Sequence, residues 1–384
     1  MNERQVKVRE ATDVRLMNHL DELAAFEPTR SPFISLYLNM QADHHGRDNF
    51  ESFVRKEFKA KAKSLAPESP EFDSFKQDAA RIRTYLQQEV RPSANGLAIF
   101  ASAGADNYFR AVQLDAPILQ HRLYVGQRPH LYPLARLIDQ YPHYVALLAD
   151  TNSARLFVFG MATTLDTQAL QQEKLSRTQI EGWSQMRYQR HVDNYHLHHA
   201  KEVVEMLGRV MREERAEHII LAGDEVIIPL LYEQLPAWLK NKVVDILRLD
   251  IRTPEHEVLK ATMAALQEHN LHSDADRVRH LLDEYRAGGL AVVTVSDTVK
   301  ALDQGQVDEL LITASSRAIR VDDGESPESA TDNQSGSESP DSNLRTADLL
   351  VRRARQTGAR ITFIEDPALL SGVGGVGAIL RYAA

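Results

Sequence analysis

The segment that decides the fold is YVALLADTNSARLFVF, at residues 144–159. Its two apolar runs, Tyr144–Ala149 and Arg155–Phe159, have the length and the branched and aromatic content of buried strands. Between them, Asp150 to Ser153 (DTNS) are residues that favour a turn. The segment therefore predicts a β-hairpin.

Strands and helices alternate downstream of this hairpin. A helix is expected over 195–214, because Val203, Leu207 and Val210 recur at helical spacing. The alternation indicates a mixed α/β sheet, and we place this central domain at residues 141–270. The other expected elements are a strand over 218–222, a helix over 225–235, a strand over 243–249 and a helix over 253–269.

The first region, residues 1–140, predicts an α+β domain without a recognisable chemical motif. The run PFISLYLNM at 32–40 is typical of a strand. Two charged helical stretches follow, and then two short apolar runs around a turn, which indicate an antiparallel pair. The expected elements are helices over 49–65 and 71–90, and strands over 97–101 and 108–114.

The third region, residues 271–384, predicts an α/β/α sandwich. It is interrupted by residues 321–344, which contain no Lys or Arg and are rich in Ser, Asp, Glu, Gly and Pro. Such a composition cannot bury enough apolar surface to offset the entropy lost on ordering, so we expect a disordered acidic insertion. The expected elements are helices over 276–286, 296–302 (with Ser296 as its N-cap) and 346–357, and strands over 290–293, 310–314 and 361–364.

The composition limits the classes of function. The 384 residues contain no cysteine, which excludes a disulfide framework, a thiolate zinc site and a thiol nucleophile. We see no signal peptide and no apolar run near the roughly 18 residues of a spanning helix. We therefore expect a cytoplasmic protein with no cofactor and no membrane partner. The net charge of -9 argues against a general DNA or RNA binder.

A glycine-rich run at 372–377 (GVGGVG) matches the GxGxxG pattern of dinucleotide sites. That pattern needs a strand before it, a helix after it, and an acidic residue about 20 positions further on. Only seven residues follow Gly377. A glycine-rich turn before a short terminal strand is the favoured interpretation, and nucleotide binding is the alternative.

Residues 163–194 show little periodicity, and we expect a long polar loop there. Between Lys174 and Lys201 the only acids are Glu181 and Asp193. Bases interleaved with aromatic residues suit an RNA surface, because Arg and Lys contact phosphates while rings stack on bases. A solvated loop is the alternative. The candidate RNA-binding residues are Lys174, Arg177, Trp183, Arg187, Tyr188, Arg190, His191 and Lys201.

Four histidines near this loop could bind a metal ion, since imidazole is a common zinc ligand. No HExxH motif is present and no acidic residue completes a recognisable ligand set. A polar helix N-terminus facing solvent or phosphates is the simpler interpretation. The four are His191, His196, His198 and His199.

Three aspartates, Asp150, Asp224 and Asp250, each follow an expected strand. Clustered strand-end carboxylates can hold Mg²⁺ for nuclease chemistry. Their simpler role is to form turns or cap helices, as the Asp150-Thr151-Asn152 sequence suggests.

The third region also resembles a known domain. Gly288–Val292 (GGLAV) leads to Val299–Leu302 (VKAL) and then to Gly305–Ile312 (GQVDELLI), and the chain closes with Gly374–Tyr382 (GGVGAILRY). This arrangement resembles the C-terminal domain of the archaeal and eukaryotic class-1 release factors and Pelota. The resemblance implies that residues 271–384 dock a translational GTPase.

A second stretch, Gly182–Arg190 (GWSQMRYQR), resembles the segment around the Gly-Gly-Gln loop of these factors. In the family that loop leaves an RNase-H-like domain and enters the peptidyl-transferase centre, where its glutamine positions water against the peptidyl-tRNA ester. Here Glu181 stands at the first glycine and Trp183 at the glutamine, so Gln185 is the candidate catalytic residue. The match adds Gly182, Ser184 and Gln185 to the candidate RNA-binding residues.

The resemblance covers roughly residues 140–384 and extends to bacterial members such as the hibernation factor Balon. The first region contains no Asn-Ile-Lys-Ser stop-codon motif. The leading hypothesis is therefore a factor that occupies the ribosomal A site without decoding, together with a GTPase of the elongation factor Tu type, in hibernation or rescue. The alternatives are a peptidyl-tRNA hydrolase that uses Gln185 and a metal-dependent nuclease. We expect the acidic surplus to lie in 321–344 and on the helices of the first region.

Overall fold

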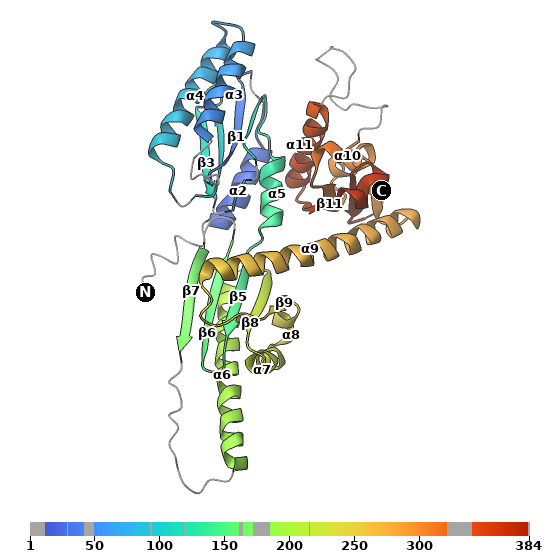
Figure 1. The fold of residues 1–384 in the computed structure, drawn as a ribbon. Coiled ribbons are helices and arrows are strands. Elements are labelled where there is room, and N and C mark those ends of the chain that lie inside the picture. Colours follow the sequence, from blue (N-terminus) through green and yellow to red (C-terminus); the bar gives the residue numbers. More distant parts are fainter. Residues whose placement is uncertain are drawn as a thin grey trace. The chain divides into compact units, whose positions relative to one another are not determined.

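The computed structural model describes residues 12–28, 30–41, 50–92, 94–114, 116–118, 120–160, 164–171, 185–214, 216–320 and 340–382. The chain divides into two units (Figure 1). The central unit is made mainly of Pro142–Asn270. The terminal unit combines Val14–Tyr141 with Leu271–Ala384. Among the described helices, none is both long enough and apolar enough to cross a bilayer.

The central unit is built on a mixed sheet, whose strands are β5 (Tyr144–Ala149), β6 (Ser153–Phe159), β7 (Thr164–Gln171), β8 (His218–Gly223) and β9 (Val243–Leu247). β5 and β6 form the predicted hairpin, with Tyr144 opposite Phe159. β7 adds an antiparallel strand beside β6, whereas β8 and β9 run parallel to β5. The strand order β7-β6-β5-β8-β9 confirms the mixed sheet that the RNase-H-like fold implies.

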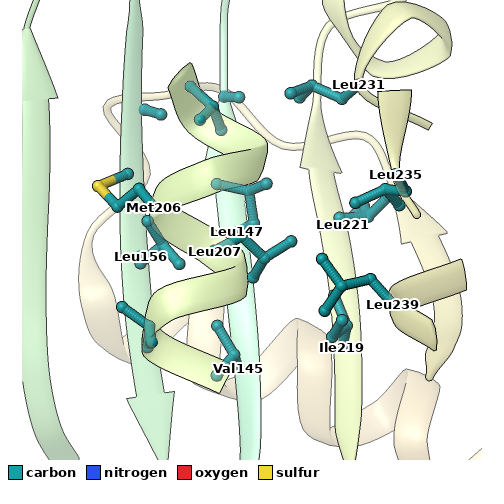
Figure 2. Packing of buried hydrophobic residues seen from close by; sticks show 14 of the residues in the cluster. Val145, Leu147, Leu156, Met206, Leu207, Ile219, Leu221, Leu231, Leu235 and Leu239 are labelled. Carbon is teal, nitrogen blue, oxygen red and sulfur yellow. The ribbon is translucent and has the colours of Figure 1, made fainter. Parts of the chain in front are cut away.

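Helices cover both faces of this sheet, and they are α6 (Gln185–Glu213), α7 (Ile227–Gln234), α8 (Ala237–Lys240) and α9 (Glu255–Arg286). Side chains alternate along β5, so Leu147 faces one layer of helices and Ala146 the other. Leu207 of α6 shares a buried cluster with Leu147 and Leu156 (Figure 2). Leu266 of α9 lies in the cluster of Ala146 on the opposite face.

The first half of the terminal unit, residues 14–141, contains an antiparallel sheet of order β3-β2-β1-β4. Helices α3 and α4 cover one face of this sheet, where Val54 and Phe58 of α3 join Ile34 and Leu36 in the core. This half has the predicted α+β character. Its elements are α2 (Thr12–Ala24), β1 (Phe33–Asn39), α3 (Phe50–Ser64), α4 (Pro70–Gln88), β2 (Gly96–Ser102), β3 (Tyr108–Leu114), β4 (Arg122–Gly126) and α5 (Tyr132–Gln140).

The second half of the terminal unit, residues 271–384, contains a sheet of order β10-β13-β11-β12. Its elements, besides the end of α9, are β10 (Ala291–Val293), α10 (Val295–Asp303), β11 (Val307–Thr313), α11 (Pro340–Gln356), β12 (Arg360–Ile364), α12 (Pro367–Leu370) and β13 (Val376–Leu380). Val278 and Leu281 of α9 share a core cluster with Leu311. Helices α10 and α11 contact each other and the strands β13 and β12, which completes the predicted sandwich.

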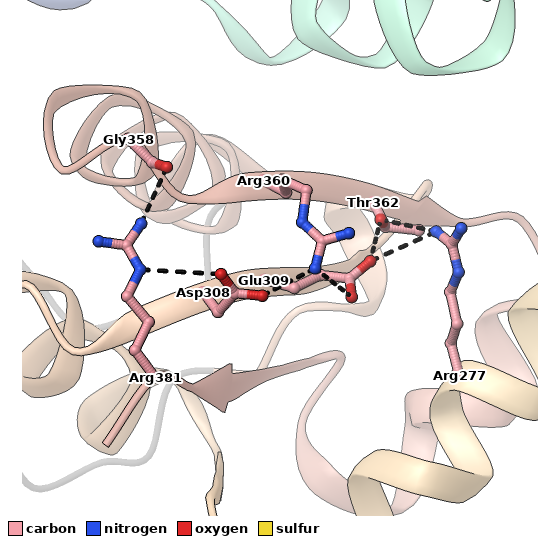
Figure 3. A network of polar contacts seen from close by, with 7 residues as sticks. All are labelled: Arg277, Asp308, Glu309, Gly358, Arg360, Thr362 and Arg381. Carbon is pink, nitrogen blue, oxygen red and sulfur yellow. Dashed lines mark hydrogen bonds and ion pairs between the residues drawn. The ribbon is translucent and has the colours of Figure 1, made fainter. Parts of the chain in front are cut away.

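Arg277 connects α9 to this sheet, within a network of polar contacts along β11 and β12 (Figure 3). Arg277 of α9 donates to Thr362 Oγ1 at 2.9 Å and pairs with Glu309 at 3.3 Å. Arg360 pairs with Asp308 at 2.7 Å. Exposed ion pairs contribute little stability, so the network mainly fixes how α9 lies against β11 and β12.

The two halves of the terminal unit share a polar interface. The Tyr132 hydroxyl of α5 donates to the Thr313 carbonyl at 2.6 Å. Arg136, one turn further along α5, pairs with Glu365 at 2.9 Å. Because Tyr132 is buried, its hydrogen bond is protected from water. Residues that lie far apart in the sequence are therefore joined in one folded unit.

Several boundaries differ from the sequence-based expectation. Helix α6 begins at Gln185 rather than near Tyr195, and β7 occupies part of the expected loop. Residues 185–194 contain no Gly or Pro and are compatible with a helix, although they lack the apolar spacing on which the prediction relied. The expectation of a loop was therefore wrong for 164–171 and 185–194, and residues 172–184 lie outside the described residues.

Three further expectations about helices were wrong. The helices expected over 253–269 and 276–286 are one continuous helix, α9, because no Gly or Pro separates them. Ser296 lies inside α10, whose N-cap position is held by Thr294 without a side-chain hydrogen bond. Helix α11 begins at Pro340 and so takes up the end of the expected acidic insertion. The part of that insertion at 321–339 lies outside the described residues.

Candidate nucleic-acid interface

Helix α6 is anchored to the central sheet by only part of its length. Its described core residues begin at Ala200 and continue through Val203, Leu207, Val210 and Met211. They recur at helical spacing and face the apolar side of the sheet. The helix has 29 residues, and its N-terminal end extends past the ends of strands β5 and β6 in Figure 1. The fold thus holds one end of α6 rigidly and extends the other.

The extended end contains much of the candidate RNA-binding segment. Helix α6 brings Gln185, Arg187, Tyr188, Arg190 and His191 onto its first two turns. Lys201 lies on the same helix and is exposed. At 1.5 Å per residue, Gln185 and Lys201 are about 24 Å apart along the axis. The remaining candidates lie outside the described residues, and they are Lys174, Arg177, Gly182, Trp183 and Ser184.

The predicted histidine group does not come together in the described residues. His198 is exposed and lies 3.2 Å from Glu202, one turn along α6. His199 is fully buried beside the turn that connects β5 and β6. Burial lowers the pKa of His199, although backbone groups of Asp150 and Ser153 act in the opposite direction. No group of three metal-binding side chains occurs in the described part of the chain.

The three strand-end aspartates form turns. Asp150 Oδ1 accepts backbone hydrogen bonds from Asn152 and Ser153, at 2.8 and 2.7 Å. Asp224 Oδ1 accepts from the backbone N–H of Ile227, at the start of α7, at 2.9 Å. A carboxylate used in this way fixes its own loop. The simpler of the two sequence interpretations is therefore the one observed.

Asp250 has the same local role. Its Oδ1 accepts from the backbone N–H of Arg252 at 2.8 Å, and its carboxylate also pairs with the Arg252 guanidinium. These contacts lower the pKa of Asp250. No group of three carboxylate or imidazole side chains that could hold Mg²⁺ occurs among the residues that the structure describes.

The glycine-rich run at the chain end is explained by backbone geometry. Gly375 has a φ of 84°, and a Cβ added there would lie 2.7 Å from the Ala318 carbonyl oxygen. A Cβ at Gly377, inside β13, would lie 2.5 Å from Leu281 Cδ2. The run is the predicted turn before a terminal strand, since β13 follows it and no helix does. A dinucleotide fingerprint would need that helix.

One charged surface escaped the sequence-based prediction. Helix α3 contains five cations and only two acids, Glu51 and Glu57. Helix α4 contains three of each sign. The expectation that the helices of the first region carry an acidic surplus was therefore wrong for α3 and α4. The run RKEFKAKAK at 55–63 was the sequence signal for this surface. Whether its cations share one exposed face depends on which residues the fold buries.

Comparison with known proteins agrees with the resemblance. Residues 129–267 match the family model described as bacterial archaeo-eukaryotic release factor family 10. Residues 271–384 match the model of eRF1 domain 3. The chain belongs to the superfamily of archaeal and eukaryotic class-1 release factors and Pelota, as a bacterial-type member. No curated protein matches the sequence at a significant level.

Several solved structures are similar to this chain at low sequence identity. An archaeal translation termination factor, aRF1, is 18% identical over 97% of this chain and 98% of its own, with a TM-score of 0.27. Archaeoglobus fulgidus Pelota is 14% identical over 75% and 79%, with a TM-score of 0.34. Dom34 of S. cerevisiae, a translation termination-like factor, is 11% identical over 79% and 93%, with a TM-score of 0.42.

Proposed function

We propose that this protein is a cytoplasmic, ribosome-binding translation factor that occupies the A site without decoding stop codons, in hibernation or rescue. Its superfamily supplies the link to translation. The absence of an Asn-Ile-Lys-Ser motif from residues 1–140 supports the non-decoding part of the proposal. Similarity to Balon in particular stays a prediction.

The observation that carries the proposal is the geometry of α6. Its C-terminal half is fixed to the central sheet, whereas Arg187 and Arg190 lie on the end that extends away from the core. A rigid helix can carry cations and the segment before it to an RNA surface without losing much chain entropy on binding. In this proposal residues 174–201 contact tRNA or rRNA near the peptidyl-transferase centre.

The proposal assigns a second role to residues 271–384, which match eRF1 domain 3. This part of the chain would bind a translational GTPase of the elongation factor Tu type. The three-domain division into 1–140, 141–270 and 271–384 belongs to the same proposal.

Charge reversal on α6 tests the proposal. The double variant Arg187→Glu, Arg190→Glu should reduce co-sedimentation with 70S ribosomes at least tenfold, since two attractive phosphate contacts become repulsive. The matched control is Arg209→Glu, Arg248→Glu, which changes the charge equally at two exposed positions of the central unit. Equal binding by the two variants would remove Arg187 and Arg190 from the interface.

A further inference from the structure

Helix α3 has a solvent-facing row of cations, which we call the α3 stripe: Arg55, Lys56, Lys59 and Lys63. All four are exposed. At 100° per residue they fall within an arc of about 100°, and Arg55, Lys59 and Lys63 follow each other at i, i+4 and i+8. Neither acid of the helix lies in that arc.

The orientation of the stripe is fixed by the opposite side of the helix. Phe50, Val54 and Phe58 are buried in the core beneath α3. Because they occupy the face against the sheet, the stripe points away from it. Arg83 of α4 is also exposed, and its guanidinium lies 5.9 Å from the Phe58 ring.

Helix stability does not explain why these cations lie in one row. Like charges at i and i+4 destabilise a helix, and Arg55, Lys59 and Lys63 make two such pairs. Placement near the helix C-terminus favours Lys63, and Glu51 four residues earlier favours Arg55, but neither effect accounts for Lys56 and Lys59. No ion pair joins the four cations to another described residue. A concentrated positive row in a chain of net charge -9 is therefore best explained by an anionic partner.

We propose that the α3 stripe binds the phosphate backbone of double-stranded ribosomal RNA. Lysines act as point charges that recognise a backbone without reading bases. The aromatic residues of α3 are buried or half-buried, so none is available to stack on an unpaired base. Arg55 and Lys63 are separated by about 12 Å along the axis, enough to span several phosphates. This inference rests on the proposed ribosome binding and adds a second contact from the first region.

The test uses the full-length protein with two probes, vacant 70S ribosomes and a 20-base-pair RNA duplex of arbitrary sequence. The variant is Arg55→Glu, Lys59→Glu, Lys63→Glu. The matched control is Arg279→Glu, Arg286→Glu, Lys300→Glu, whose cations are exposed and paired with carboxylates at i,i+3. A third protein with glutamine at the three α3 positions separates loss of charge from charge repulsion.

The α3 variant should bind both probes at least tenfold more weakly near 0.1 M salt, while the control changes less than about twofold. Its affinity should also depend less steeply on salt, with a slope lower by about two to three, because three phosphate contacts are lost. The glutamine variant should lie between the two. Circular dichroism verifies that each variant is folded.

Other outcomes overturn the inference in distinct ways. Weaker ribosome binding with unchanged duplex binding would indicate an acidic ribosomal protein as the partner. Unchanged binding to both probes would leave the stripe as a solvated face. If wild type fails to bind ribosomes but binds the duplex through the stripe, the proposed function fails and this inference stands. If wild type binds neither probe, both fail.

Discussion

Asp348 of α11 accepts a hydrogen bond of 2.9 Å from the backbone N–H of Tyr132, the first residue of α5. The same Oδ1 accepts from the Leu131 N–H, also at 2.9 Å. Leu131 provides no side-chain cap, so a residue 216 positions away caps the helix. These two hydrogen bonds link α11, in the second half of the terminal unit, to the N-terminus of α5, in the first half.

His130 reinforces this cap. Its ring Nδ1 contacts the second carboxylate oxygen of Asp348. Burial lowers the pKa of His130 to about 3, with Arg122 acting in the same direction. Because a carboxylate has no proton to donate, the ring Nδ1–H is the donor in this contact.

The first prediction concerns this cap. Asp348→Ala should lower the free energy of unfolding by about 2–4 kcal/mol, because two backbone N–H groups and a buried ring lose their acceptor. Asp348→Asn keeps an acceptor oxygen and should cost less. Urea denaturation followed by circular dichroism measures both. Equal losses for the two variants would contradict this reason, because they would show that the carboxylate charge matters rather than an acceptor oxygen.

The second prediction concerns Asp139 of α5, whose Oδ2 accepts from the Phe363 N–H of β12 at 2.9 Å. Burial raises the pKa of Asp139 to about 7, and Asp274 and Glu365 add to the rise, while the Phe363 N–H and Arg277 oppose it. Between about pH 4 and 7 the folded state therefore holds a proton that the unfolded state has released. Stability should fall as pH rises through this window and then level off.

Asp139→Asn removes this titration while keeping the acceptor for Phe363. The variant should be more stable than wild type at pH 8, by an amount on the order of 1–3 kcal/mol, with a smaller difference at pH 5. Urea midpoints at the two pH values measure the effect. Asp283→Asn, at an exposed position, is the matched control. A wild-type midpoint that rises from pH 5 to pH 7 relative to the variant would contradict the assignment.

The third prediction separates backbone geometry from ligand binding in the glycine-rich run. Gly375→Ala should destabilise the protein by at least about 1–2 kcal/mol, because an L residue is strained at a φ of 84° and meets the Ala318 carbonyl. Gly372→Ala has open space around its Cβ and should be nearly neutral. Thermal melts measure both variants. A rise in melting temperature on adding ATP or NAD would argue for a nucleotide site instead.

The fourth prediction concerns the hairpin turn between β5 and β6. Asp150→Ala should lower the free energy of unfolding by about 1–2 kcal/mol, since its Oδ1 accepts from the Ser153 N–H and hydroxyl. Asp150→Asn should retain most of this stability. A labelled RNA incubated with wild type and Mg²⁺ should stay intact on a gel. Cleavage that disappears in both variants would restore the nuclease alternative.

The hairpin, the sandwich and the glycine-rich turn could be predicted because their signals are local. Tyr144–Phe159 carries two apolar runs and a turn in one short segment, and the strands formed where expected. Helix α5 was not predicted although Pro133 lies in its first turn, and the side chain that caps it, Asp348, is distant in the sequence. β7 was missed because the sequence of 164–171 is only weakly apolar, and its strand depends on pairing with β6.

The sequence predicted which types of residue make up the candidate interface, but not that some of them lie on a helix. The cations and aromatic residues of 174–201 indicated an RNA surface, whereas the helical start at Gln185 has no apolar face to reveal it. For the α3 stripe, the sequence did not show that the cations form one surface. Its lysines are obvious in the sequence, yet only the burial of Phe50, Val54 and Phe58 shows that they share one exposed face. In both surfaces, tertiary packing determines how the charged residues are arranged.

The measurement that tests the central claim most directly uses ribosomes with labelled peptidyl-tRNA in the P site and an empty A site. Peptide release and ribosome binding are read from the same tubes, for wild type and Gln185→Ala. The account predicts that both proteins bind and that neither releases peptide. Release by wild type that disappears in Gln185→Ala would contradict it and make the protein a peptidyl-tRNA hydrolase.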